Sequence, residues 1–215
     1  MMHIRSFTFN PFEENTYVLY DESGEAVIVD PGCYEKMEHE ELKAFIRSEK
    51  LTVKWLLNTH CHIDHVLGNF FVKKEYNIPL LIHPVELPVL KAVKSYASNY
   101  GFPGYQEVLP DHELKEGTPF RFGSTVLDVI FLPGHSPGHV GFYHAGQHVL
   151  IAGDVLFFHS IGRTDLPGGN LDTLLSSIHQ KLFSLPDDVV VHPGHGPITT
   201  LGEEKVNNPF CALPV

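Results

Sequence analysis

The segment THCHIDH (residues 59–65) is the most informative stretch for identifying the fold. It places four candidate metal ligands in a loop directly after an apolar run. That run, VKWLL (53–57), has the β-branched and aromatic composition of a strand. In an extended chain, side-chain direction repeats every second residue, so His60 and His62 point the same way. The two imidazoles are therefore expected to face one side of the loop.

A turn at residues 63–64 is expected to carry Asp64 and His65 toward a neighbouring point. One short loop can then supply ligands to two adjacent metal ions. Imidazole and carboxylate together suit zinc, iron or manganese. Cys61 lies between the two histidines, but strand alternation turns it the opposite way, so we interpret it as a buried structural residue.

Three later segments repeat this design, in which a strand ends at a histidine or an aspartate next to glycine. They are FLPGH (131–135), LIAGD (150–154) and VHPGHG (191–196). Glycine lets the backbone turn sharply and approach an ion closely. Core packing does not explain four strands that all deliver such residues to loops. The further candidate ligands are His135, Asp154 and His195.

The chain has 15 histidines, and most of those outside these motifs are interpreted as ordinary polar or surface residues. His139 and His192 lie next to the motifs, where a structural role and a role in orienting a ligand are equally consistent with their positions. Asp30, at another strand end, is expected to orient a metal-bound histidine, as carboxylates often do.

Strand and helix patterns run through two similar halves of the chain, strands first and helices after. In the first half the expected strands are 3–9, 16–20, 26–29, 53–57 and 79–82, and the expected helices are 34–50, 66–76 and 85–100. In the second half the expected strands are 120–122, 125–132, 140–144, 148–152 and 189–191, and the expected helix is 171–185. Such a chain can stack two sheets face to face and cover each outer face with helices.

Composition and charge limit the classes of partner. The chain has 215 residues, of which 43% are hydrophobic, and this suits one large domain with a sizeable core. The formal net charge of −11 argues against nucleic acid. No segment is apolar enough to span a bilayer, so no membrane partner is expected. The N-terminus lacks a signal-peptide pattern and the three cysteines are scattered, so a cytoplasmic protein is expected.

Four motifs resemble those of the metallo-β-lactamase superfamily in order and spacing over nearly the whole chain. They are HCHIDH (60–65), PGHS (133–136), AGD (152–154) and PGHG (193–196). The resemblance implies an α/β (α+β) fold with four layers, αβ/βα. Two stacked mixed sheets would carry helices on both outer faces.

The same resemblance implies two divalent metal ions as cofactors, zinc in the first place and iron or manganese as alternatives. The first ion would be held by His60, His62 and His135. The second would be held by Asp64, His65 and His195, with Asp154 bridging the two ions. Asp64 and Asp154 are accordingly also candidate catalytic residues.

Within the superfamily the chain resembles glyoxalase II and its short relatives. The similar stretches are IGRTDLPGGN (161–170), HPGHGPITT (192–200) and GEEKVNNPF (202–210). This implies a thioesterase that hydrolyses S-D-lactoylglutathione, or a related small-molecule thioester, by means of a metal-bridging hydroxide. Full-length glyoxalase II has a basic residue near Arg163 that helps to hold glutathione. Arg163 is thus a candidate substrate-binding residue, and an ion pair with Asp165 is the equally weighted alternative.

Two features depart from full-length glyoxalase II. Only a short tail follows His195, so we expect one domain over residues 1–215, without the helical C-terminal extension that supplies further contacts to glutathione. Two tyrosines of the full-length enzymes are replaced by Pro197 and Asp165. Both departures bear on glutathione recognition and leave the metal chemistry unaffected.

Other functions share this fold. A persulfide dioxygenase would use one Fe(II) held by His60, His135 and Asp154, and it has a similar GRTD stretch (162–165). A lactonase would use the same hydroxide for ring opening. A secreted β-lactamase is disfavoured by the N-terminus. Metal stoichiometry and oxygen consumption separate the dioxygenase from the hydrolases, and the sequence gives no indication of oligomeric state.

Overall fold

A computed structural model describes residues 1–214 of the chain. Residue contacts divide the chain into two compact units. Unit 1 consists of Met1–Leu114 and Arg121–Val126, and unit 2 consists of Lys115–Phe120 and the chain from Leu127 onward. The single domain over residues 1–215 that the sequence suggests stays a prediction.

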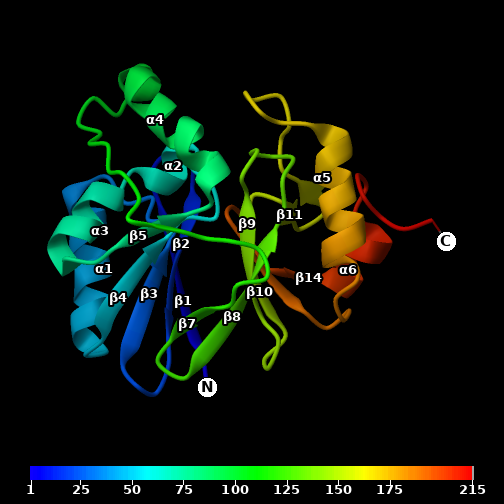
Figure 1. The fold of residues 1–215 in the computed structure, drawn as a ribbon, viewed down its shortest axis with the longest axis horizontal. Helices are drawn as coiled ribbons and strands as arrows, with labels where there is room; N and C mark the ends of the chain where they lie inside the picture. Colours follow the sequence, from blue (N-terminus) through cyan, green and yellow to red (C-terminus); the bar gives the residue numbers. More distant parts are fainter. Residues whose placement is uncertain (215) are drawn as a thin grey trace. The chain divides into compact units, whose positions relative to one another are not determined.

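Unit 1 is built on a six-stranded mixed sheet in the order β1-β2-β3-β4-β5-β6 (Figure 1). Its strands are β1 (His3–Phe9), β2 (Glu14–Tyr20), β3 (Glu25–Val29), β4 (Thr52–Leu57), β5 (Leu80–Ile82) and β6 (His112–Glu113). The first three strands pair antiparallel, whereas β3 to β6 pair parallel. Because the carboxyl ends of parallel strands meet at one edge of a sheet, Asp30 after β3 and His60 after β4 are brought to the same edge.

Helical elements follow the strands of unit 1. They are α1 (Lys36–Ser48), α2 (Ile63–Val66), α3 (Asn69–Tyr76), α4 (Leu87–Tyr96) and the 3₁₀ turns η1 (Pro84–Glu86) and η2 (Ala97–Tyr100). Leu42 of α1 and Val72 of α3 are fully buried in one apolar cluster with strand residues such as Ile28 and Leu56. This core fixes the sheet edge from which the candidate ligands extend.

The second six-stranded sheet is also mixed, in the order β14-β13-β10-β9-β8-β7 (Figure 1). Its strands are β7 (Phe120–Phe122), β8 (Thr125–Phe131), β9 (Val140–His144), β10 (Val149–Gly153), β13 (Val190–Pro193) and β14 (Thr199–Thr200), and a separate ribbon joins β11 (Leu156–Phe157) to β12 (Ser160–Ile161). β10 and β13 run parallel, so the residues that follow them leave the sheet side by side.

The helical elements of unit 2 are α5 (Leu171–Ser177), the π-helical turn η3 (Ile178–Leu182) and α6 (Leu201–Asn207). Leu174 of α5, Leu182 of η3 and Leu201 of α6 are fully buried with strand residues such as Leu150 and Val191. The predicted α/β class, with two mixed sheets and helices, is thereby confirmed.

One predicted helix, 66–76, is wrong in its extent, because the chain forms two helices there, α2 and α3. The hydrogen bond that would continue α2 runs from the amide of Gly68 to the carbonyl of Asp64. Instead, the Gly68 amide donates to the Pro31 carbonyl (2.8 Å), and the Asp64 carbonyl accepts from the Asn10 side chain (3.1 Å). Two tertiary hydrogen bonds thus replace one helical bond, and the helix ends.

Other differences are smaller. The predicted helix 171–185 ends at Leu182 and finishes in the π-helical turn, in which the Phe183 amide donates to the Ile178 carbonyl five residues back. Helix α6 was not predicted, although Thr200 caps it by accepting from the Glu203 amide, and a Thr three residues before a Glu is a known start signal. The two-residue strands were not predicted either, because two residues are too few to show alternation.

Within residues 1–214, no helix is both long and apolar enough to cross a lipid bilayer. The three cysteines, Cys33, Cys61 and Cys211, are buried free thiols, as expected from their scattered positions.

Candidate metal centre

The loop after β4 carries His60, whose side chain has no exposed surface. The Thr59 hydroxyl donates to Oδ2 of Asp30 (2.5 Å) and lies 3.1 Å from Nδ1 of His60. A hydroxyl has one proton, so it can only accept from His60, which places the imidazole proton on Nδ1. The Nε2 atom of His60 then keeps its lone pair for a metal ion.

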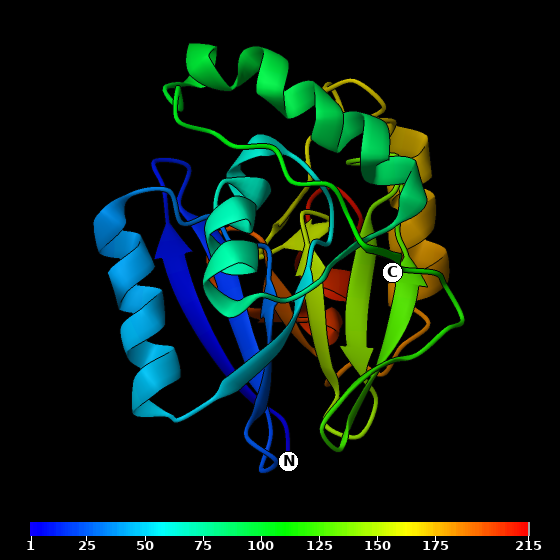
Figure 2. The same cartoon turned by 60° about the vertical axis from the view of Figure 1, so that its left-hand side comes forward.

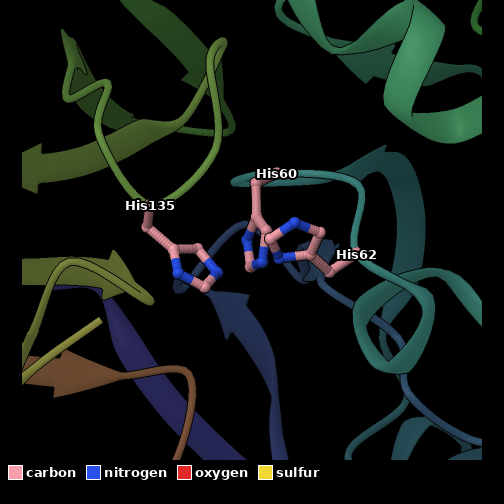
Figure 3. Close-up of side chains that lie close together, drawn as sticks. All are labelled: His60, His62 and His135. Atoms are coloured by element: carbon pink, nitrogen blue, oxygen red, sulfur yellow. The ribbon is translucent and has the colours of Figure 1, made fainter. Parts of the chain in front are cut away.

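His62 is the N-cap residue of α2, and its backbone is extended (φ −67°, ψ 155°). The expected turn at residues 63–64 is wrong, since the chain enters this short helix at Ile63. Figure 3 draws the imidazoles of His60 and His62 on the loop after β4, and their ring centroids are 4.8 Å apart. Helix α2 brings Asp64 and His65 to the same place: the His65 ring lies 4.2 Å from that of His60, and Nε2 of His65 lies 3.7 Å from Oδ2 of Asp64.

Asp30 orients this group. Its Oδ1 accepts from the Thr59 amide (2.7 Å), and its Oδ2 lies 3.2 Å from Nδ1 of His65. A carboxylate on Nδ1 holds the proton there and directs Nε2 of His65 toward a ligand. Asp30, His60 and His65 could themselves hold an ion. Because both carboxylate oxygens of Asp30 already accept hydrogen bonds, the contacts agree better with the expected orienting role.

Glu14 was not singled out from the sequence, yet its side chain lies beside His65. Its side chain is fully buried, with Oε1 3.8 Å from Nδ1 of His65 and Oε2 accepting from the Thr16 hydroxyl (2.8 Å). Burial raises the pKa of Glu14 well above its usual range, an effect that the charges of Asp30 and Asp64 increase and that of His65 opposes. A cluster of acidic groups around imidazoles is typical of residues that surround a cation.

Unit 2 supplies His135 from the turn after β8 (Figure 3). Gly134 has φ +136°, and a Cβ at this position would overlap the backbone of Leu174 in α5. Only glycine therefore fits at position 134, directly before the histidine. Nδ1 of His135 lies 2.8 Å from the carbonyl oxygen of Arg163, to which it donates, so Nε2 is the atom left for a metal ion.

Asp154 lies between two histidines of unit 2. Its Oδ2 is 3.6 Å from Nε2 of His135 and 3.5 Å from Nε2 of His195. His195 comes close because β10 and β13 are parallel neighbours, and each is followed by one of these residues. His139 is buried and accepts from the Asp154 amide (3.0 Å), so it holds the loop that carries this carboxylate. A carboxylate with an imidazole on either side is suited to contact two ions.

Of the residues whose role was open, Arg163 forms the ion pair with Asp165 that the sequence suggested. His192 is mostly buried, and burial lowers its pKa to about 4. Cys61 is fully buried, with its amide donating to the Glu86 carboxylate (2.9 Å), and burial raises the pKa of its thiol. These contacts agree with the structural role predicted for Cys61.

Sequence reasoning missed two further residues of the site besides Glu14. A Cβ at Gly162 would overlap the carbonyl oxygen of Asp154, so the GRTD stretch begins with the one residue that fits there. Asn10 donates to the carbonyl oxygens of Gly32 and Asp64, both at 3.1 Å. Neither residue belongs to a ligand pattern, and only the tertiary contacts reveal them.

The structure therefore gathers the predicted ligands into two sets, one in each unit. Unit 1 brings four of them together, namely His60, His62, Asp64 and His65. Unit 2 brings three together, namely His135, Asp154 and His195. Both sets consist of imidazoles and carboxylates, the donors that zinc, iron and manganese accept.

Comparisons with known proteins agree with this chemistry. Residues 9–195 match the metallo-beta-lactamase superfamily. A Haemophilus influenzae protein named hydroxyacylglutathione hydrolase GloC is 36% identical over 211 residues, which cover 97% of this chain and 98% of that protein.

Two crystal structures are similar over almost their whole length. The BLEG-1 B3 metallo-beta-lactamase has a TM-score of 0.88 at 39% identity, covering 98% of this chain and 99% of that one. TTHA1623 in a di-iron-bound form has a TM-score of 0.85 at 38% identity, covering 96% and 99%. The chain thus belongs to the metallo-β-lactamase superfamily of metal-dependent hydrolases.

Proposed function

We propose that this protein is a metal-dependent thioesterase of the hydroxyacylglutathione hydrolase type, which cleaves S-D-lactoylglutathione or a related thioester. The observation that carries the proposal is the pair of imidazole and carboxylate sets, whose members come from the four motifs that resemble those of the superfamily. The similarity to GloC over nearly the full length of both chains favours a thioester among the substrates of this superfamily.

In this proposal the two sets form one centre for two metal ions. His60, His62 and His135 would hold the first ion, and Asp64, His65 and His195 would hold the second. Asp154 would contact both. The di-iron form of TTHA1623 supports two ions and makes iron a candidate beside zinc. When bound, the ions would lower the pKa of water toward neutrality and polarise the thioester carbonyl.

The residues of this chain would mainly position the groups that react. Asp30 and the Arg163 carbonyl hold the Nδ1 protons of His65 and His135, so that Nε2 of each faces the centre. The thiol that leaves has a pKa near about 8.5, so it departs as a thiolate without a dedicated acid. A serine or cysteine nucleophile with its own base is therefore not required.

The test is thiol release from S-D-lactoylglutathione by purified protein whose metal content per chain has been measured. Asp64→Ala is the control, because it removes a proposed ligand of the second ion. Fast release that fails in the variant supports the proposal. No release by protein that carries two ions would exclude this substrate.

The same preparation should be offered three further substrates. A lactone and a β-lactam test ring opening, the β-lactam because BLEG-1 is so similar in fold. Glutathione persulfide with oxygen tests the dioxygenase alternative, for which oxygen consumption and one iron per chain are expected. Turnover of one of these in place of the thioester would replace the proposed function.

A further inference from the structure

Four aromatic residues of unit 1, Phe12, Tyr96, Tyr100 and Phe102, form a continuous surface that we call the aromatic shelf. The Phe12 ring lies 6.3 Å from that of Tyr100 and 6.0 Å from that of Phe102, and Tyr96 lies 5.5 Å from Tyr100. Phe102 is buried, but Phe12 is 40% and Tyr100 54% exposed. Two large rings that touch each other therefore remain open to solvent.

The loop that carries Phe12 is fixed to the metal-binding loop. Asn10 has a left-handed backbone (φ 53°), and its side chain donates to the carbonyl of Asp64 while accepting from the Phe12 amide (2.9 Å). Its own amide donates to Glu38 of α1 (2.6 Å). Figure 2 shows this loop, between β1 and β2, at the same end of unit 1 as the end of α4 and η2. Phe12 is thus held in place beside the loop of Asp64.

The other end of the shelf lies on α4, a helix that contacts α2, the helix of Asp64. Tyr96 is half-buried, and burial raises its pKa to about 12, with the negative charge of Asp64 contributing. Tyr34 packs against the shelf. Its ring lies edge-on to that of Phe102, with the ring centroids 4.9 Å apart, and its hydroxyl accepts from the Gly104 amide. Both ends of the shelf therefore lie on segments that contact the backbone or the helix of Asp64, a proposed metal ligand.

The chemistry of the exposed rings indicates what the shelf can hold. Phe12 and Tyr100 offer apolar surface, and the charges near them are mixed: Glu13 is exposed on the loop of Phe12, and Lys91 and Lys94 are exposed on α4. Glutathione is a charged peptide, so the acyl group is the part of an S-acylglutathione that can be apolar throughout. An uncharged, apolar group would gain by covering the two exposed rings.

From these contacts we propose that the aromatic shelf binds the acyl group of the thioester, and that this site accepts apolar acyl groups, alkyl or aromatic, larger than lactoyl. The inference rests on the proposed thioesterase function and names its substrate class. Phe12 and Tyr100 act here as specificity-determining residues, because they contact the acyl group without taking part in the chemistry.

The test compares S-acylglutathiones with acetyl, butanoyl, hexanoyl and phenylacetyl groups, using protein of known metal content. Each added methylene should raise kcat/KM by about fourfold until the shelf is covered. In Phe12→Ala/Tyr100→Ala this dependence should be mostly lost, with hexanoyl falling by about tenfold or more relative to acetyl. Tyr100→Phe should keep the dependence, because the ring and not the hydroxyl makes the contact.

Phe210→Ala/Leu213→Ala is the matched control, since it removes two exposed apolar side chains of unit 2 (58% and 43%). It should keep the wild-type dependence on acyl length. A second series holds the lactoyl group constant and varies the thiol, and the shelf variant should leave that series unchanged. An acyl series that stays equally steep in the shelf variant, or a loss in the thiol series instead, would overturn the assignment.

Binding separates a failure of this inference from a failure of the proposed function. If the metal-loaded protein cleaves no thioester, the proposed function fails, and calorimetry with acetate, hexanoate and phenylacetate still tests the shelf. Hexanoate and phenylacetate should bind more tightly than acetate to the wild type. Equal binding of all three, or a preference that the shelf variant retains, would contradict an apolar acyl site.

Discussion

The guanidinium of Arg163 forms a two-point ion pair with the carboxylate of Asp165: Nε donates to Oδ1 and Nη2 to Oδ2, both at 2.7 Å. Hydrogen bonding to Arg163 lowers the pKa of Asp165 to about 2, so both partners are charged over the whole range in which an enzyme assay is run. The Arg163 carbonyl also accepts from His135. The side chain and the backbone of this residue therefore have separate tasks.

The first prediction concerns that side chain. If it attracts glutathione, Arg163→Ala should raise KM by about tenfold with little change in kcat, as loss of uniform binding does. Asp165→Asn should lower KM, because it releases the guanidinium for the substrate. If the pair is only structural, both variants leave KM unchanged and lower the free energy of unfolding only slightly, as loss of an exposed ion pair does. Steady-state kinetics and urea titration of the two variants decide.

Asp64→Ala is the second prediction. Loss of this carboxylate should reduce the metal content from two ions per chain toward one, and kcat should fall by about a hundredfold or more, because one ion cannot supply both roles. Metal analysis after dialysis, together with thiol release, measures both effects. Retention of two ions with wild-type turnover would remove Asp64 from the ligand set.

The third prediction concerns Asp30, which holds His65 and Thr59 without itself being assigned to an ion. Asp30→Asn should weaken metal binding by about 10–100-fold, the usual effect of losing a partner that orients a ligand. Asp21→Asn is a matched control: Asp21 is a buried carboxylate of the same unit that accepts from Ser124 and Thr125. Competition with a chelator should show weaker binding in the first variant and no change in the second.

The ligand motifs could be predicted because each follows directly after a strand. The strand itself is recognised from the alternation of a few neighbouring residues. β1 and β9 were predicted to the residue, and β3 and β4 to within one residue, since alternation along a few residues defines them. The break between α2 and α3 was not predictable, because it depends on Asn10 capturing the Asp64 carbonyl across 54 positions of sequence. The pattern of neighbouring residues contains no information about a hydrogen bond between such distant positions.

The surroundings of the ligands were less predictable than the ligands. Glu14 sits in a strand whose residues are almost all buried, so no polar face marks it as close to His65. Phe12 and Tyr100 are ordinary aromatic residues until the fold places them together. Asp30 and His139 were named from their positions next to motifs, and their contacts with His65 and Asp154 give those positions a physical reason.

The fourth prediction concerns His192, whose pKa burial lowers to about 4. In the unfolded chain this group takes up a proton as the pH falls through about 6.5, whereas the folded protein does so only near 4. Stability that is complete above pH 6.5 is therefore lost between 6.5 and 4, by up to about 1.4 kcal/mol per pH unit. His192→Gln should remove this slope. Urea unfolding of both proteins from pH 4 to 8 measures it, and parallel curves would show that burial of His192 does not drive the loss.

The fifth prediction uses two glycines with positive φ that differ in their surroundings. At Gly101 (φ +92°) an added Cβ meets nothing within 4 Å, so Gly101→Ala should cost only backbone strain, about 1 kcal/mol of unfolding free energy. At Gly134 (φ +136°) the same atom overlaps the backbone of Leu174, so overpacking adds to the strain and Gly134→Ala should cost about 3 kcal/mol. Since His135 follows directly, only Gly134→Ala should also weaken metal binding. Equal losses of stability in the two variants would mean that α5 shifts at Leu174 to make room for the added Cβ. Glycine at position 134 would then not be required to position His135.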